Sequence, residues 1–305
     1  MNVIIAHLKS QRPNLAENTY VTYARSILRL RKISADFEPP VIDKYLQTLT
    51  ATTARNLLTA LVVYDGRDVW SRRHEKYNTL AVQHRDQQSL SDYESARWTT
   101  WKRVVAAIRR MKQDCENQKL FVRKAITASD YRLLSGYVAM SIHKYFQWRN
   151  DVPSIRVVET TADAGKGNCY IKSLGRFVLR EFKTAKFFRR RRDFPVTLDA
   201  PKPLRAILHK FIKHHGSEWL LPQFNGNKTS KNSFKGLLQH ITYRYLGLRL
   251  GTTMLRKIYL TEFLSTDPRL TDRKRVLRNM LQLNLEQQFQ YRRRVEPFTE
   301  KRTEI

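Results

Sequence analysis

The segment "TASDYRLLSGYVAMSIHKYFQWRND", from Thr127 to Asp151, predicts one strong helix followed by a change of pattern. Apolar residues recur along one side of it at helical spacing. Thr127 and Asp130 have the spacing of a helix start signal, and we expect the helix to end at Arg149. The local structure of the chain should change directly after this helix.

Residues beyond the helix alternate between apolar and polar types, which is the period of a β-strand. Strands are expected at residues 154–161, 168–174, 176–182 and 191–198. The period is helical again from Pro201, with Gly, Asn and Pro breaks between expected helices at residues 203–215, 230–247, 251–265 and 272–282. This part of the chain is therefore expected to form a mostly helical domain with a small antiparallel sheet.

The charge of the chain points to an anionic partner. The 305 residues include 57 Lys and Arg against 27 Asp and Glu, and 57 − 27 gives a formal net charge of +30. Cations that neutralise phosphates release condensed counterions, so nucleic acid is the partner that such a charge favours. A membrane surface is the competing interpretation, but the basic residues are spread over the chain and are not gathered on one amphipathic helix or tail.

The first third of the chain predicts several short basic helices. Apolar residues at helical spacing mark residues 17–32, 39–49 and 52–66. Such helices can form a small module that grips DNA, or a plain bundle whose basic face is only solvated. The first reading makes residues 1–90 an N-terminal helical DNA-binding domain, and residues 91–305 a second domain.

The boundary is placed where a polar, Gln-rich stretch gives way to an amphipathic helix. Ser91 and Glu94 have the spacing of a capping box that opens this helix. Trp98 and Trp101 lie three residues apart, and a packing seam between the domains explains them better than a platform for stacking bases.

Several kinds of site are not supported. Cys115 and Cys169 are far apart and lie in no Cys/His cluster, so neither a disulfide framework nor a zinc knuckle is expected. The Gly-containing stretch at residues 163–168 lacks the spacing and the Ser or Thr of a P-loop. No carboxylate cluster or transmembrane-length apolar run stands out. We expect no cofactor, no metal and no membrane contact, in a soluble protein of a reducing compartment.

The remaining candidates are cations and one hydroxyl. Arg149 precedes the expected sheet, Lys183 lies in the turn "EFKTAKFF", Arg256 lies in "GTTMLRKIYL", and Tyr291 lies in "NLEQQFQYRRRVEP". Each one alone is explained more simply as a solvated charge or a structural tyrosine. Tyr291, however, has polar flanks, which makes it a poor core residue and a candidate hydroxyl beside an anion.

In this order these residues resemble the tyrosine recombinase (phage integrase) superfamily, in particular the divergent enzymes of large DNA viruses, virophages and eukaryotic mobile elements. The resemblance covers nearly the whole chain. It implies a helical N-terminal core-binding (SAM-like) domain and a mostly helical catalytic domain, which together clamp DNA. It also implies that the catalytic residues are Arg149, Lys183, Arg256 and the nucleophile Tyr291, with Lys186 as the nearby alternative to Lys183.

Two positions depart from the family pattern. The His of its HxxR box falls on Thr253, and its later His or Trp falls on Gln282. Thr and Gln can hydrogen-bond a phosphoryl oxygen, but neither exchanges protons near neutral pH. Both residues stay in the expected site as hydrogen-bonding groups.

The implied reaction is site-specific recombination or integration through a covalent 3′-phosphotyrosyl intermediate at Tyr291, without metal or ATP. The implied partners are double-stranded DNA and further copies of the chain, as a dimer or tetramer on DNA. The implied place is inside the cell with DNA, and the host nucleus if the source is a eukaryotic virus or element. We expect DNA backbone contacts from Arg25, Arg29, Lys186, Arg189, Arg190, Arg191, Arg192 and Lys231.

Three other functions remain open from the sequence. A type IB topoisomerase-like enzyme would share the cations and the nucleophile but would relax DNA as a monomer. A catalytically inactive DNA-binding or architectural protein could keep the fold, and Thr253 and Gln282 favour it. An RNA-binding protein is also conceivable, although no aromatic strand pattern for RNA is present.

Overall fold

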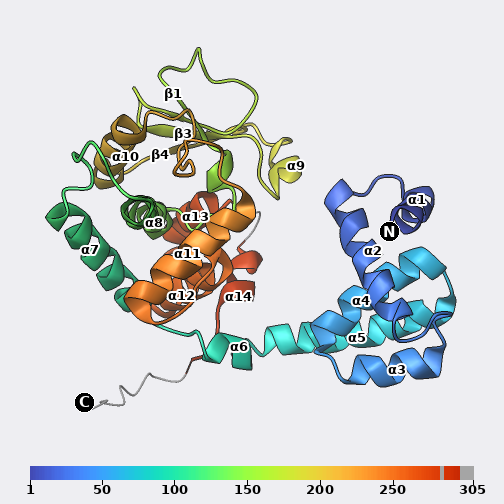
Figure 1. Cartoon of the computed structure of the whole chain (residues 1–305). Coiled ribbons are helices and arrows are strands. Elements are labelled where there is room, and N and C mark those ends of the chain that lie inside the picture. Colours follow the sequence, from blue (N-terminus) through green and yellow to red (C-terminus); the bar gives the residue numbers. More distant parts are fainter. Residues whose placement is uncertain (282–284, 296–305) are drawn as a thin grey trace. The chain divides into compact units, whose positions relative to one another are not determined.

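The computed structural model describes residues 1–281 and 285–295. The chain divides into two compact units, Met1–Ser89 and a second that begins at Leu90. Most elements of both units are labelled in Figure 1. No helix among the described residues is both long and apolar enough to cross a membrane.

The first unit is helical throughout. Its helices are α1 (Asn2–Gln11), α2 (Glu17–Arg31), α3 (Pro39–Gln47), α4 (Ala51–Asp65) and α5 (Asp68–Asp86). The three helices expected in this region are confirmed as α2, α3 and α4. Helix α4 ends at Gly66, which adopts the left-handed φ of 71° that favours glycine. Its core includes Leu30, Leu58 and Trp70, all fully buried.

The second unit is organised around helix α8 (Ala128–Tyr145). The predicted start is confirmed, because Thr127 and Asp130 form a reciprocal capping box. Every residue from Leu133 to His143 is buried. The neighbours that bury it are α7 (Trp101–Asn117), α10 (Lys202–His215) and α11 (Lys231–Leu246), which lie beside it in Figure 1. The remaining helices are α6 (Asp92–Ser95), α9 (Ala185–Phe188), α12 (Thr252–Ser265), α13 (Leu270–Asn279) and α14 (Glu286–Tyr291).

All four expected strands are present. They are β1 (Arg156–Val158), β2 (Cys169–Ile171), β3 (Arg176–Leu179) and β4 (Val196–Asp199), in the order β1-β2-β3-β4. The β2–β3 and β3–β4 pairings are antiparallel, as expected, whereas β1 and β2 are parallel. The sheet is mixed because the connection at residues 159–168 returns the chain to the end of the sheet at which β1 began. The short helix α9 lies in the connection between β3 and β4.

The expected helix after residue 91 is two helices. The capping box of Ser91 and Glu94 is present, but α6 ends at Ser95. Helix α7 begins separately, capped by the Thr100 hydroxyl, which accepts a hydrogen bond from the backbone N–H of Arg103. Trp98 and Trp101 lie on either side of this new start. Both are partly buried against the core of the second unit, and a seam between the domains stays a prediction.

Candidate active site

Arg149 and Tyr291 are in direct contact although 142 residues separate them. The Nη2 atom of Arg149 donates a hydrogen bond of 3.2 Å to the hydroxyl oxygen of Tyr291. Tyr291 is the last residue of α14, and its ring packs on a small apolar cluster of Leu260, Val276 and Met280. The cluster fixes the ring, while the hydroxyl reaches the guanidinium.

Arg149 does not end a helix, and this part of the prediction was wrong. Helix α8 ends at Tyr145, and Phe146 is already extended, with φ −131° and ψ 97°. The rings of Phe146 and Trp148 stack with centroids 5.0 Å apart, and both are buried. Residues two apart do not share a side of a helix but do share a side of an extended chain, so this packing stops the helix.

A hydrogen bond fixes the Arg149 segment to helix α12. The hydroxyl of Thr252 donates to the side-chain oxygen of Asn150 over 3.1 Å. Thr252 is buried in the first turn of α12, the helix that also carries Arg256. The two arginines are therefore held on segments that are joined directly.

Arg256 is buried to 1% exposure and lies beneath Tyr291. Its Nε donates to the backbone oxygen of Gln147 over 2.5 Å, and its Nη2 donates to the backbone oxygen of Met280. Its Nη1 has no hydrogen-bond partner within residues 1–281 and 285–295. Burying an unpaired polar atom is costly, and this one belongs to the guanidinium that faces the Tyr291 ring.

The guanidinium of Arg256 lies 5.4 Å from the centre of the Tyr291 ring. Burial and the nearby charge of Arg149 lower the pKa of Arg256 to about 10. Burial alone would raise the pKa of Tyr291, but the charges of Arg256, Arg149 and Lys183 outweigh it, and the pKa of Tyr291 is lowered. The site thus favours the phenolate form, which is the nucleophilic form of tyrosine.

Lys183 is exposed in the β3–β4 connection, as expected. The adjacent Thr184 donates its hydroxyl hydrogen to the backbone oxygen of Leu281 over 3.0 Å. Leu281 has a φ of 55°, in the left-handed region where Leu is uncommon. In this turn the Met280 carbonyl accepts from Arg256, and the next carbonyl, that of Leu281, accepts from Thr184 beside Lys183. Lys183 therefore lies close enough to lower the pKa of Tyr291.

Asp151 is a residue of this site that the sequence analysis did not single out. Burial raises its pKa, and the charges of Lys231, Arg149 and Arg256 act in the opposite direction. A carboxylate among three cations limits their mutual repulsion. The available signal was its position, two residues after Arg149 in "RND".

The two departures from the family pattern have different outcomes. Thr253 is exposed on the first turn of α12, whereas its neighbour Thr252 faces inward to Asn150. Gln282 lies outside the described residues. The roles of Thr253 and Gln282 as hydrogen-bonding groups of the site stay predictions.

The predicted DNA contacts are exposed side chains in three places. Arg25 and Arg29 lie on α2 in the first unit, and Lys231 is the first residue of α11. The largest group lies on α9 and in the turn that follows it, and consists of Lys186, Arg189, Arg190, Arg191 and Arg192. Of all these residues, Lys231 is the one whose charge acts on Asp151 in the site.

Removing the cation that touches the Tyr291 hydroxyl should change its ionisation. In Arg149→Gln a charge that stabilises the phenolate is lost, so the pKa of Tyr291 should rise and less phenolate should exist at any given pH. The measurement is an ultraviolet phenolate titration of each protein against the same protein carrying Tyr291→Phe, because the chain has 14 tyrosines.

Arg176→Gln is the matched control for this titration. Arg176 is partly exposed at the start of β3 and pairs with Asp199 over 2.6 Å, so the same charge is removed without touching Tyr291. A Tyr291 pKa that is equal in Arg149→Gln and in this control would contradict the assignment of the shift to Arg149.

Within the described residues, no group of three or more His, Cys, Asp and Glu side chains is arranged to hold a metal ion. The charges gathered at Tyr291 come from Arg and Lys side chains. Such groups stabilise phosphoryl oxygens by hydrogen bonding and charge.

Comparison with solved structures identifies the fold. A lambda integrase dimer bound to a COC' core site matches with a TM-score of 0.56 and 13% identity, covering 99% of this chain and 80% of that chain. Lambda integrase(75-356), also as a dimer bound to a COC' core site, matches with a TM-score of 0.53 and 12% identity, covering 99% of this chain and 99% of that chain. A lambda integrase tetramer bound to a Holliday junction matches with a TM-score of 0.52 and 11% identity, covering 95% of this chain and 76% of that chain.

No family model and no curated protein matches the chain. The structural likeness extends over both units, and at these identities it is a likeness of fold. The chain therefore has the mainly helical fold, with a small mixed sheet, that is seen in lambda integrase.

Proposed function

We propose that this protein is a site-specific DNA recombinase or integrase that cuts and rejoins DNA through a covalent 3′-phosphotyrosyl bond at Tyr291. The observation that carries the proposal is the contact of Arg149 with the Tyr291 hydroxyl, with Arg256 buried beneath the ring. The net charge of +30 and the fold seen in lambda integrase bound to DNA support it.

The proposed chemistry uses the charges around Tyr291. The phenol loses its proton to solvent, and the phenolate oxygen bonds to the phosphorus of a DNA phosphodiester. The bond from phosphorus to the 5′ oxygen breaks, and that oxygen takes a proton from Lys183. Arg149 and Arg256 stabilise the extra negative charge of the pentacoordinate transition state. Thr253 and Gln282 are assigned as further hydrogen-bonding groups to the phosphate.

Rejoining is the reverse reaction with a second 5′ hydroxyl. The phosphotyrosyl bond keeps the energy of the broken linkage, so no ATP is required. The proposed partners are double-stranded DNA and further copies of the chain, as a dimer or tetramer, by analogy with the lambda integrase dimers and tetramer on DNA. Residues 1–90 are proposed to grip the DNA and residues 91–305 to carry the reaction.

The test is covalent trapping on a nicked duplex. After cleavage, the short strand that carries the freed 5′ hydroxyl diffuses away, so the adduct cannot be rejoined. Wild-type protein with its cognate site should give a DNA-linked species that survives denaturation, in the presence of a chelator and without ATP. Absence of this species on the cognate site would contradict the proposal and favour a DNA-binding protein that has kept the fold, the alternative that Thr253 in place of a histidine supports.

Strand exchange separates the two enzymatic possibilities. A recombinase should join ends from two differently labelled duplexes. A topoisomerase-like enzyme should relax supercoiled DNA as a monomer and leave the two labels on separate molecules.

A further inference from the structure

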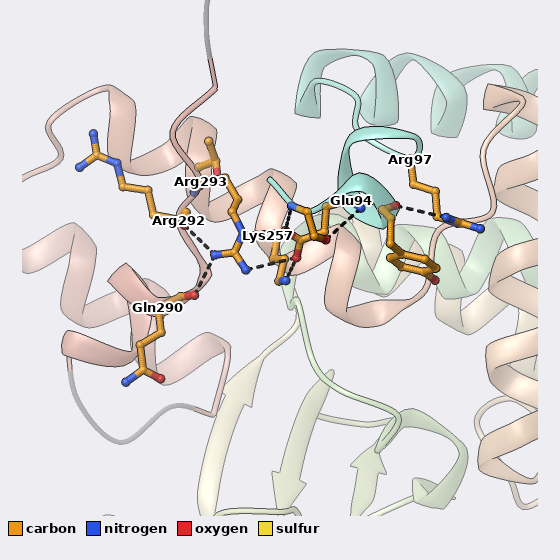
Figure 2. Close-up of polar contacts among 9 residues, drawn as sticks. Glu94, Arg97, Lys257, Gln290, Arg292 and Arg293 are labelled. Atoms are coloured by element: carbon orange, nitrogen blue, oxygen red, sulfur yellow. Dashed lines mark hydrogen bonds and ion pairs between the residues drawn. The ribbon is translucent and has the colours of Figure 1, made fainter. Parts of the chain in front are cut away.

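The buried carboxylate of Glu94 is far from Tyr291 in sequence but binds the segment that directly follows Tyr291. Glu94, on the short helix α6, is 6% exposed and lies against Lys257 and Arg293 (Figure 2). Its Oε2 accepts from Nε of Arg293 over 2.9 Å and its Oε1 accepts from Nη2 over 3.2 Å. This two-bond geometry is the strong form of an Arg–carboxylate pair.

Arg293 makes further hydrogen bonds to its own chain segment and to α12. Its Nη1 donates to the backbone oxygens of Gln290 and Arg292, over 3.1 and 2.9 Å. Its backbone N–H donates to the Thr261 hydroxyl over 2.9 Å. The side chain therefore folds back over the C-terminal end of α14, two residues after Tyr291, and joins that end to Glu94 and to α12.

Helix α14 depends on such contacts. It has six residues, and a helix of that length has no independent stability in water. Within the described residues its hold on the protein includes the Gln288 side chain, which donates to the Arg273 backbone oxygen over 2.7 Å, and the Arg293–Glu94 pair beyond Tyr291. One anchor lies before the tyrosine and the other lies after it.

Glu94 is held in place by the chain that enters the second unit. Its backbone N–H and the Ser91 hydroxyl form one half of the capping box, and the same Oε2 that binds Arg293 accepts from the Ser91 backbone N–H over 3.3 Å. Without this carboxylate, no acidic side chain among residues 1–281 and 285–295 would be paired with Lys257 or Arg293, and two partly buried cations without a counter-charge are unfavourable.

We infer that Glu94, acting through Arg293, is a positioning residue that holds Tyr291 against Arg149 and Arg256 of the same chain. The inference rests on the function proposed above. Breaking the pair releases the end of α14, and the nucleophile is then presented to the phosphate less often. A displacement of about 1 Å at a reacting group lowers a rate by about 10²-fold.

Glu94→Gln is the test, because it keeps the size of the side chain and removes its charge. Amide exchange over residues 285–295 should become faster, and single-turnover formation of the covalent DNA species should slow by about 10²-fold. DNA affinity should not fall, since the variant loses a negative charge. Arg97→Gln is the matched control: Arg97 lies on the same chain segment, points away from Glu94 in Figure 2, and contacts Tyr93.

The ionisation of Tyr291 distinguishes positioning from a direct effect of charge. Loss of an anion by itself would lower a tyrosine pKa. Release of Tyr291 from Arg149 and Arg256 would raise it. A raised Tyr291 pKa in Glu94→Gln therefore supports positioning, and a lowered or equal pKa contradicts it.

Arg293→Gln serves as the second variant if Glu94→Gln unfolds, because it leaves Glu94 paired with Lys257. It should reproduce the faster exchange and the slower reaction. Unchanged exchange over residues 285–295, or faster exchange with a wild-type rate, would overturn the inference. If wild-type protein forms no covalent species, the proposed function fails, whereas the exchange and titration results still decide whether Glu94 holds Tyr291.

Discussion

Tyr291→Phe is expected to eliminate the covalent DNA species while leaving the fold and DNA affinity intact. The variant removes the only atom proposed to bond to phosphorus and keeps the ring that packs on Leu260, Val276 and Met280. The loss to stability is one hydrogen bond from Arg149, about 1 kcal/mol. The measurements are denaturing gel detection of the adduct on the nicked substrate and a binding titration on the intact site.

Tyr259→Phe is the matched control, because Tyr259 packs on the same apolar cluster and its ring stacks on Phe263. It should form the adduct at the wild-type level. Adduct formation by Tyr291→Phe would show that the nucleophile is another residue, which peptide mapping of the adduct would then locate.

Most of the fold was predictable because its elements are periodic and have clear ends. The cap at Thr127 and the stop at Gly66 follow from local chemistry, and both are confirmed. Helix α5 was not predicted, because its sequence is strongly polar and only Trp70 and Ala81 are buried. The parallel pairing of β1 and β2 was also missed, since alternation locates a strand and does not give its direction.

The site was predictable only in part, because local sequence patterns do not show which distant residues meet. Chain order, through the resemblance, gave the expectation that Arg149, Arg256 and Tyr291 converge, and in the structure they do. Glu94 had a correct local reading as a capping-box residue. Its second role depends on Arg293, which is 199 residues away, and no local pattern carries that information.

Arg256→Lys is expected to lower the rate of covalent adduct formation by about 10²- to 10³-fold, the usual effect of removing one donor to a transition-state oxyanion. Lysine keeps the positive charge beneath Tyr291 but lacks the planar fork. Arg256 uses Nε and Nη2 for the carbonyls of Gln147 and Met280, and Nη1, which has no partner among the described residues, is the donor that we propose for the phosphate. A single ammonium group cannot reach both carbonyls and the phosphate, so it either holds the two carbonyls or binds the phosphate.

Where the ammonium group binds the phosphate, the same substitution should lower the free energy of unfolding by about 1–3 kcal/mol, because at least one of the two buried carbonyls then loses its donor. Urea unfolding measures the change in the free energy of unfolding, and single-turnover kinetics at saturating protein measures the rate of adduct formation. Arg275→Lys is the control, since Arg275 is exposed on α13 and pairs with Asp272. A wild-type rate in Arg256→Lys would mean that charge alone is sufficient beneath Tyr291. A slow rate at near-wild-type stability would mean that the lysine holds the two carbonyls and leaves the phosphate without its donor, which is the outcome that most directly separates the structural and catalytic roles of this residue.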